Sequence, residues 1–230
     1  MLITVCKMSL LQTVTVSDTM RNNAKTPTPA APPTSVLQTV RSGRPLNTQR
    51  RTREYLTPKE VELLVGAAKQ RGRRYGLRDA TMISVAYRHG LRVSELCALK
   101  WDQIDFGASK MHVRRLKNGM HSVHLIGGAE LRALRALRRE DINSPFVFMT
   151  ERGAPMTRDG FLKLITRLGT TADFPFPIHP HMLRHATGFK LANDGQDTRA
   201  LQHYLGHKNI MHTVRYTELS PERFKNFWED

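Results

Sequence analysis

The sequence predicts a mainly α-helical domain that carries one small antiparallel β-sheet, an α+β fold. Two observations lead to this prediction. Most segments after Tyr55 repeat apolar residues at the three- and four-residue spacing of one helix face. Alternation of apolar and polar residues, the pattern of a half-buried strand, is concentrated in residues 104–125. We see no internal repeat, so a single domain is expected.

The first helix is predicted to begin at Thr57, because residues 57–60 (TPKE) form a capping box with proline at the first helical position. Its apolar stripe continues through residue 68. Further helices are expected over 77–89 and 93–99.

The alternating stretch predicts antiparallel strands, with Asn118-Gly119 as the hairpin turn between the last two. The alternating apolar residues are Ile104, Phe106, Met111, Val113, Val123 and Leu125. The later elements are expected to be a helix over 129–139, a short strand over 146–148, a helix opening at 157, helices over 182–192 and 198–205, and short helical pieces to Trp228.

Residues 1–50 are predicted to form a disordered basic arm, and residues 51–230 the folded domain. The arm has four prolines in residues 27–34 and a net charge of +5, from six Lys or Arg and one acid. A solvated tail without a role is the alternative. The first residues faintly resemble a signal peptide but lack its basic start and cleavage site, so we expect no targeting function. Met8 and Met20 are alternative initiators.

The charge of the chain indicates a polyanionic partner. The sequence has 36 Lys and Arg against 20 Asp and Glu, a formal charge of +16, and a pI of about 10.5. No apolar run approaches the roughly 18 residues of a membrane-spanning helix. Two cysteines, Cys6 and Cys97, are too few for a disulfide scaffold or a four-cysteine zinc site. We therefore expect a cytoplasmic, nucleoid-associated protein without membrane contact, with both thiols reduced and Cys97 in the core.

Several side chains have the chemistry needed to break a phosphodiester. Arginine forks bind phosphate oxygens and stabilise the charge that gathers there in the transition state. A tyrosine phenol can attack phosphorus if a nearby base or cationic field offsets its pKa near 10. Histidine is the usual base, and a lysine can protonate the departing sugar oxygen. The candidates are Arg92, Lys117, His181, Arg184, His207 and Tyr216.

Each of these residues taken singly has a simpler interpretation, such as a solvated arginine or a core tyrosine. Two histidine pairs, 181/185 and 203/207, have the spacing of metal ligands on a helix. No cysteine lies beside them and the HExxH pattern is absent, so we expect ordinary histidines and no metal.

In combination and in this order, the residues resemble the tyrosine recombinase (phage integrase-like) family. The chain looks most like the short recombinases that switch type 1 fimbriae by DNA inversion. The resemblance runs from about Tyr55 to the C-terminus and does not cover residues 1–50, where many members carry a helical core-binding domain. The matching motifs are GLRVSEL (90–96), HMLRH (181–185), LGH (205–207) and Tyr216.

The resemblance implies a role for each matched residue. Arg92 and Arg184 would bind the scissile phosphate, and His207 would hydrogen-bond it. Tyr216 would be the nucleophile that forms a 3′-phosphotyrosyl bond. His181 would assist proton transfer at the nucleophile.

Two further positions support this set. Lys117 resembles the hairpin lysine that protonates the leaving 5′ oxygen, and Lys110, which also flanks the hairpin, is its alternative. Glu95 matches an acidic position of the family. A carboxylate one helical turn from Arg92 can hold that arginine or a histidine in place.

The resemblance also implies double-stranded DNA as the partner and a homotetramer on synapsed DNA. The basic arm or a host DNA-bending protein would compensate for the missing core-binding domain. No cofactor is expected: the sequence has no P-loop and no carboxylate cluster for Mg²⁺, and a phosphotyrosyl ester conserves the energy of the broken bond.

Several alternatives stay open. A recombinase-derived regulator would bind DNA without cutting it, a type IB topoisomerase-like enzyme would relax supercoils, and a histidine-based metalloenzyme is a more distant possibility. The apolar face formed by Phe224, Phe227 and Trp228 docks either on a neighbouring protomer or on its own chain. Inversion, integration, excision and dimer resolution all use the same chemistry.

Overall fold

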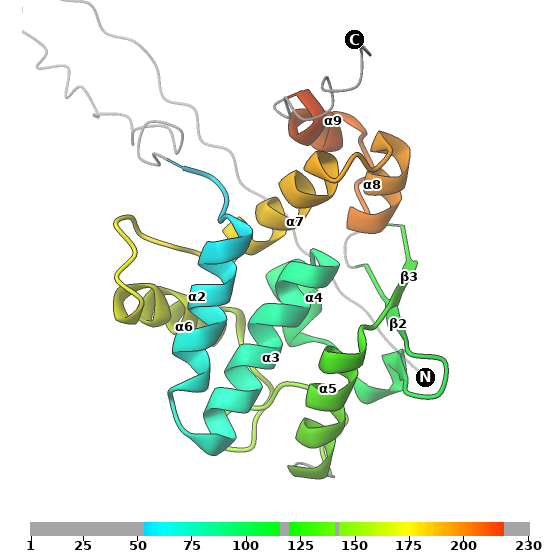
Figure 1. Cartoon of the computed structure of the whole chain (residues 1–230). Coiled ribbons are helices and arrows are strands. Elements are labelled where there is room, and N and C mark those ends of the chain that lie inside the picture. The colour runs from blue at the N-terminus through cyan, green and yellow to red at the C-terminus, as the bar shows by residue number, and fades with distance from the viewer. Residues whose placement is uncertain (1–52, 116–119, 141–142, 219–230) are drawn as a thin grey trace, which may run out of the picture. The chain divides into compact units, whose positions relative to one another are not determined.

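The structure is a computed structural model and describes residues 53–115, 120–140 and 143–218. These residues form mostly helices and a three-stranded antiparallel sheet of order β1-β2-β3 (Figure 1), which confirms the predicted fold class. In chain order the elements are α2 (Pro58–Lys69), α3 (Arg73–His89), α4 (Val93–Cys97), a 3₁₀ turn (Trp101–Gln103), β1 (Ile104–Asp105), β2 (Lys110–Val113), β3 (Ser122–Leu125), α5 (Gly128–Glu140), α6 (Arg158–Thr171), α7 (His181–Asn193), α8 (Thr198–Leu205) and α9 (Met211–Glu218).

Helix α3 is the centre of the main core and packs against α2, α5 and α7. Met82, Ile83 and Val85 on α3 are fully buried, and each contributes on the order of 1.5–3 kcal/mol through burial. Helix α2 begins at the predicted capping box: Thr57 Oγ1 accepts from the Glu60 N–H at 3.3 Å, and Glu60 Oε2 accepts from the Thr57 N–H at 2.7 Å. This box fixes the N-terminal edge of the core.

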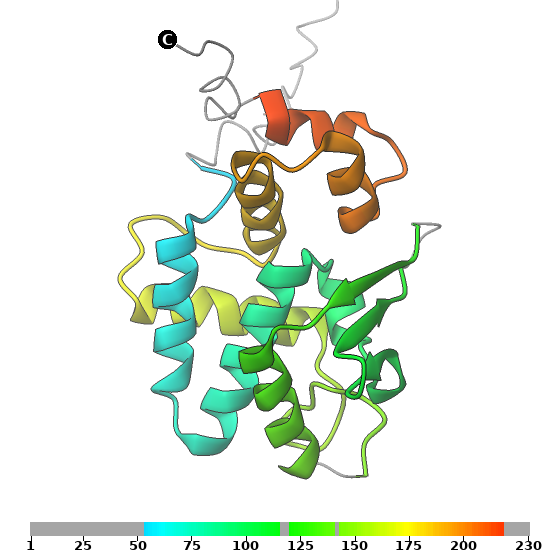
Figure 2. The same cartoon turned by 45° about the vertical axis from the view of Figure 1, so that its right-hand side comes forward.

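The sheet lies beside α8 (Figure 2), and it has the predicted antiparallel pairing. On β3, however, the buried residue is His124, whereas Val123 and Leu125 are 56 % and 76 % exposed. A histidine can be buried at this position because its ring stacks on Tyr204 of α8 and its nitrogens contact Ser122 and His89. The predicted turn at Asn118-Gly119 lies outside the described residues.

The strand predicted over residues 146–148 is wrong. Phe146 forms an isolated bridge with Lys100, and no ladder develops beyond it. Instead, the Val147 N–H bonds the Leu99 carbonyl and the Phe148 carbonyl accepts from Met156, at 2.9 Å each. Single bonds to two different segments satisfy this buried backbone, so the apolar residues reflect core packing and not strand pairing.

Helices α7, α8 and α9 share a smaller apolar cluster made of Phe189, Ala192, Leu201, Leu205 and Tyr216. Two left-handed glycines end helices next to this cluster: Gly90 after α3, with φ 57°, and Gly206 after α8, with φ 64°. A Cβ on Gly90 would lie 2.6 Å from Leu205 Cδ2. The turns that follow α3 and α8 are therefore in close contact, although they are more than 100 residues apart in sequence.

Candidate active site

Arg92 and Glu95 lie at the start of α4, directly after the Gly90 turn. Arg92 donates from Nη1 to Glu95 Oε1 at 2.8 Å, and its backbone N–H donates to Glu95 Oε2 at 2.9 Å. The Arg92 side chain also reaches across to the second turn, where Nη2 is 3.4 Å from the Gly206 carbonyl oxygen. Burial raises the pKa of Glu95, but Arg115 and Arg92 outweigh it and hold the carboxyl below its ordinary pKa. Glu95 is therefore an anion that fixes Arg92.

Arg184 ties the two glycine turns together from α7. Its Nη1 donates to the Gly90 carbonyl and its Nη2 to the Leu205 carbonyl, the latter at 2.6 Å. The residue is 2 % exposed. Burial, followed by repulsion from Arg92 and Arg115, lowers the pKa of Arg184 to about 9. Three guanidinium groups thus crowd around one carboxylate, and an anion bound among them would relieve their repulsion.

His207 follows Gly206 and is also buried. Its Nδ1 is 2.8 Å from Thr213 Oγ1, and its carbonyl accepts from Gln202 Nε2 at 3.1 Å. Burial and the positive charges of Arg184 and Arg92 lower the pKa of His207 to about 3. A neutral imidazole is consequently held against the arginines, where it can donate or accept one further hydrogen bond.

A shallow pocket of about 690 Å³ opens over Arg92 and His207. Its lining has three cationic side chains and no carboxylate, which suits a phosphate group. The lining residues are Arg92, Arg199, Gln202, His207, Lys208, Asn209, Ile210 and His212.

Tyr216 lies on α9 and is not among the residues that line this pocket; it is buried to 2 % exposure. Its ring is stacked with His207, with centroids 6.2 Å apart, and packs edge-on against Phe189 at 5.1 Å. Burial raises the pKa of Tyr216, although Arg184 and Arg215 act in the opposite direction. The nucleophile candidate is thus a neutral phenol next to Arg184 and His207.

The hydroxyl of Tyr216 contacts His185, a residue that sequence reasoning treated only as half of a metal-like pair. His185 Nδ1 is 2.9 Å from the Tyr216 hydroxyl. His181, exposed at the start of α7, meets His185 edge-on with ring centroids 4.5 Å apart. Burial, followed by the His181 and Arg215 charges, lowers the pKa of His185 to about 3. The direct hydrogen-bond partner of the Tyr216 hydroxyl is therefore a neutral His185, and His181 contacts His185.

The two lysine candidates differ in what the structure says about them. Lys117 lies outside the described residues. Lys110 is exposed at the start of β2, opposite Leu125 and at the end of the strand away from Arg115. Lys110 thus lies at the sheet end that is remote from the arginines.

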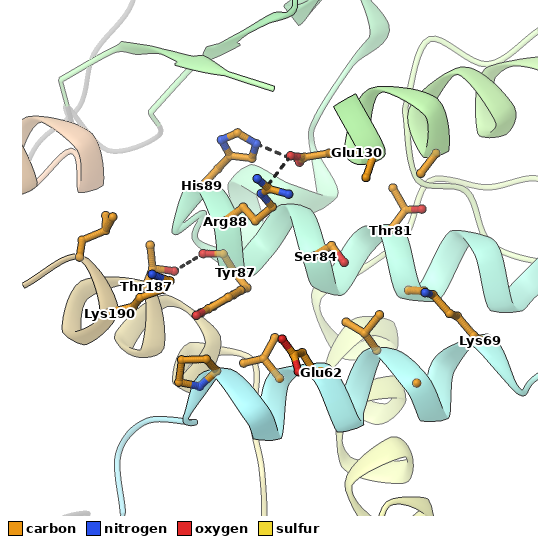
Figure 3. A pocket seen from close by; sticks show the side chains of 18 of the residues that line it. Glu62, Lys69, Thr81, Ser84, Tyr87, Arg88, His89, Glu130, Thr187 and Lys190 are labelled. Atoms are coloured by element: carbon orange, nitrogen blue, oxygen red, sulfur yellow. Dashed lines mark hydrogen bonds and ion pairs between the residues drawn. The ribbon is translucent and has the colours of Figure 1, made fainter. Parts of the chain in front are cut away.

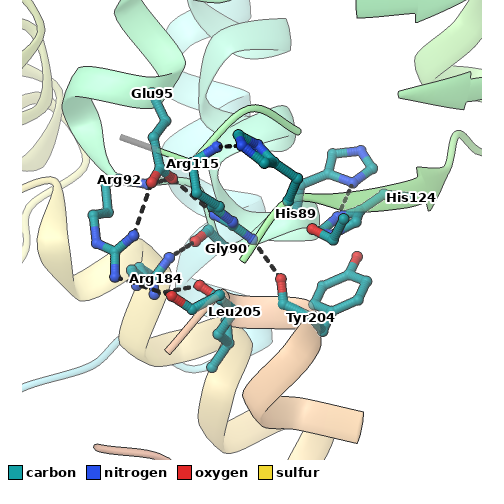
Figure 4. Close-up of polar contacts among 12 residues, drawn as sticks. His89, Gly90, Arg92, Glu95, Arg115, His124, Arg184, Tyr204 and Leu205 are labelled. Atoms are coloured by element: carbon teal, nitrogen blue, oxygen red, sulfur yellow. Dashed lines mark hydrogen bonds and ion pairs between the residues drawn. The ribbon is translucent and has the colours of Figure 1, made fainter. Parts of the chain in front are cut away.

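Arg115 is a second residue of the site that the sequence did not indicate. Its side chain is 0 % exposed, and Nη1 donates to Glu95 Oε2 at 2.7 Å while Nη2 donates to the Tyr204 carbonyl (Figure 4). No motif marks it among 36 basic residues.

His89 and His124 form a separate buried pair, with their Nδ1 atoms 3.1 Å apart. The other ring nitrogen of His89, Nε2, is 2.9 Å from Glu130 Oε1.

A second pocket, of about 750 Å³, lies between α2, α3, α5 and α7 (Figure 3). Polar groups such as Tyr87, Thr187 and Lys190 line it together with apolar side chains, but none of the candidate residues does.

Among the described residues, no group of three or more His, Cys, Asp or Glu is placed to hold a metal ion. None of the helices in the described part of the chain combines the length and apolarity needed to cross a bilayer.

The fold is that of the tyrosine recombinases. The chain belongs to the phage integrase family, whose model matches residues 54–223. It is 40 % identical to the type 1 fimbriae regulatory protein FimE of Escherichia coli K12 over 183 residues, covering 77 % of this chain and 91 % of FimE. It is 34 % identical to the tyrosine recombinase XerD of Ralstonia nicotianae over 203 residues, 85 % of this chain and 64 % of XerD.

Solved structures agree with this assignment. The XerA recombinase superposes with a TM-score of 0.66 at 25 % identity, over 77 % of this chain and 64 % of XerA. The XerH recombinase, solved in complex with its palindromic difH substrate, has the same fold: TM-score 0.66 at 18 % identity, over 76 % of this chain and 52 % of XerH. The resemblance to tyrosine recombinases that the motifs indicated is therefore confirmed, and the family match supports site-specific DNA recombination.

Proposed function

We propose that the protein cuts and rejoins double-stranded DNA through a covalent 3′-phosphotyrosyl intermediate. The observation that supports this most directly is the convergence of Arg92, Arg184 and His207 around two glycine turns, with the Tyr216 phenol alongside. The three groups offer hydrogen-bond donors and net positive charge to one phosphate. Such fixed donors stabilise the charge that the phosphate oxygens gain in the transition state.

In the proposed reaction the Tyr216 oxygen attacks the scissile phosphorus, and the bond from phosphorus to the 5′ oxygen breaks. The phenolic proton passes along the 2.9 Å hydrogen bond to His185, whose pKa an anionic phosphate bound beside Arg184 would raise from its low value in the free protein. His181, in ring contact with His185, assists this transfer. The leaving 5′ oxygen takes a proton from Lys117. We favour Lys117 over Lys110 because Lys110 lies at the end of β2 that is away from Arg115. Rejoining is the reverse, with a 5′ hydroxyl of another strand as the nucleophile.

A homotetramer follows from this chemistry. Exchange between two duplexes breaks four strands, and each chain supplies one Tyr216 nucleophile. Four copies on synapsed DNA are therefore required, and sedimentation of the DNA complex would measure the number. A complex that contains two chains after complete strand exchange would contradict this assembly.

The arm and the tail extend the proposal to residues outside the described part of the chain. Deleting residues 1–50 should flatten the dependence of log K on log salt by about 0.9 for each phosphate that the arm neutralises. An unchanged slope would show that the arm does not bind DNA, and recovery of activity by a purified DNA-bending protein would identify the host factor.

Truncation after Pro221 should abolish assembly on DNA and leave the monomer folded if the tail docks on a neighbour.

The reaction itself is tested by trapping. The protein is mixed with nicked DNA that carries sequence from around its own gene, and a denaturant-resistant protein–DNA adduct is sought for the wild type and for Tyr216→Phe. We expect an adduct only with the wild type. An adduct with Tyr216→Phe would show that the nucleophile is another residue, and DNA binding without an adduct would favour a non-cutting regulator.

A further inference from the structure

Arg115 connects three of the segments that carry proposed catalytic groups. It directly follows β2 and precedes Lys117 by two residues. Its Nη1 bonds Glu95 of α4, and its Nη2 bonds the carbonyl of Tyr204 at the end of α8 (Figure 4). One guanidinium thus links the base of the hairpin to the Arg92 turn and to the His207 turn.

The contact with Glu95 has an electrostatic consequence for Arg92. Glu95 binds Arg92 through both its side chain and its backbone N–H, so by itself it would neutralise the charge offered to a phosphate. Arg115 supplies a second cation to the same carboxylate, 2.7 Å away. With Arg184 included, the cluster holds three positive charges and one negative charge, a net charge of +2.

The contact with the α8 end has a geometric consequence. A Cβ on Gly206 would lie 2.6 Å from Arg115 Nε, so the backbone at position 206 lies against the guanidinium. The Gly206 carbonyl is also the group that faces Arg92 Nη2, and His207 is the next residue. Removing Arg115 would free the turn to shift, and a 1 Å displacement of a catalytic group can cost about 100-fold in rate.

Because the Arg115 side chain is fully buried, it has no access to DNA. We propose that Arg115 is a positioning residue for DNA cleavage, which acts by holding Arg92 through Glu95 and the His207 turn through the Tyr204 carbonyl. This inference rests on the proposed function. In this proposal Arg115, which belongs to no sequence motif, holds the two glycine turns together so that they form one phosphate site.

The test compares Arg115→Met with Arg115→Lys, and uses Arg114→Met as the control, since Arg114 is the adjacent arginine, 59 % exposed and paired with Asp102. In the trapping assay at saturating DNA, Arg115→Met should form the adduct about 100-fold more slowly, and the Kd for DNA should weaken by no more than about tenfold. Arg115→Lys restores the charge near Glu95 but not the fork, so it should recover part of the rate. The control should cleave at the wild-type rate.

The double variant Glu95→Gln/Arg115→Met separates positioning from a loss of stability. It removes both charges of the buried pair and so avoids an uncompensated charge. If Arg115 acts on Arg92 through Glu95, the double variant should cleave no more slowly than the slower single variant. The proposal would be overturned if the rate losses of the two single variants multiplied in the double variant. A wild-type cleavage rate in Arg115→Met, or a defect confined to DNA binding, would overturn it as well.

A measurement that needs no cleavage distinguishes this inference from the proposed function. Inorganic phosphate is titrated at constant ionic strength and its Kd is taken from the rise in Tm. Arg115→Met should weaken phosphate binding about tenfold, and Arg114→Met should not. Unchanged phosphate affinity, or no phosphate binding by the wild type, would overturn the positioning role. Weakened phosphate binding in a protein that forms no adduct would retain that role and contradict only the recombinase reaction.

Discussion

Three buried histidines should make the folded protein sensitive to mild acid. Burial, the first cause for each, and neighbouring positive groups lower the pKa of His124, His185 and His207 to about 3. In the unfolded chain these rings titrate near 6.5. The unfolded state therefore binds more protons between pH 6.5 and 3, so stability is full above that window and falls as the pH drops through it. Between pH 7.5 and 5.5 each of these histidines should lower the free energy of unfolding by about 1.4 kcal/mol, or about 4 kcal/mol for the three together.

Urea unfolding at the two pH values measures this loss, which is large against a typical stability of about 5–15 kcal/mol. Carboxylates of the unfolded chain titrate near pH 4, below this range, so they contribute little to the difference. His185→Asn should show about 1.4 kcal/mol less pH dependence than the wild type, whereas His203→Asn, an exposed control on α8, should show the full dependence. The reasoning is refuted if stability changes by less than about 1 kcal/mol between the two pH values, or if His185→Asn keeps the whole effect.

Three further substitutions test the packing that forms the site. Thr57→Ala removes the capping box of α2 and should lower the free energy of unfolding by about 1 kcal/mol in urea titration; no change would mean that the cap is redundant. Gly206→Ala should cost more than Gly153→Ala and also slow cleavage, because both have positive φ but only position 206 meets Arg115, and equal costs would contradict the close approach. Glu95→Gln leaves Arg115 buried without its anion and should cost about 3–5 kcal/mol, measured by urea unfolding; a decrease under about 1 kcal/mol would show that Arg115 finds another partner.

The local elements of this protein are readable from sequence where a single segment determines them. The capping box at Thr57 and the amphipathic helices depend on residues within one or two turns of each other. The strand predicted over 146–148 failed because its apolar residues face the core through single bonds to separate segments. The buried face of β3 was hidden for a related reason, since His124 is buried by partners from α3 and α8.

By itself, the sequence determined the fold class, the family motifs and the set of candidate residues, because these depend on residue types and their spacing along the chain. Only the tertiary structure showed that His185 is the partner of the Tyr216 hydroxyl and that Arg115 is fully buried between Glu95 and Tyr204. Both facts depend on side chains 20 to 89 residues apart in sequence. Periodicity along the sequence carries no information about such contacts, because they depend on how separate elements pack together in space.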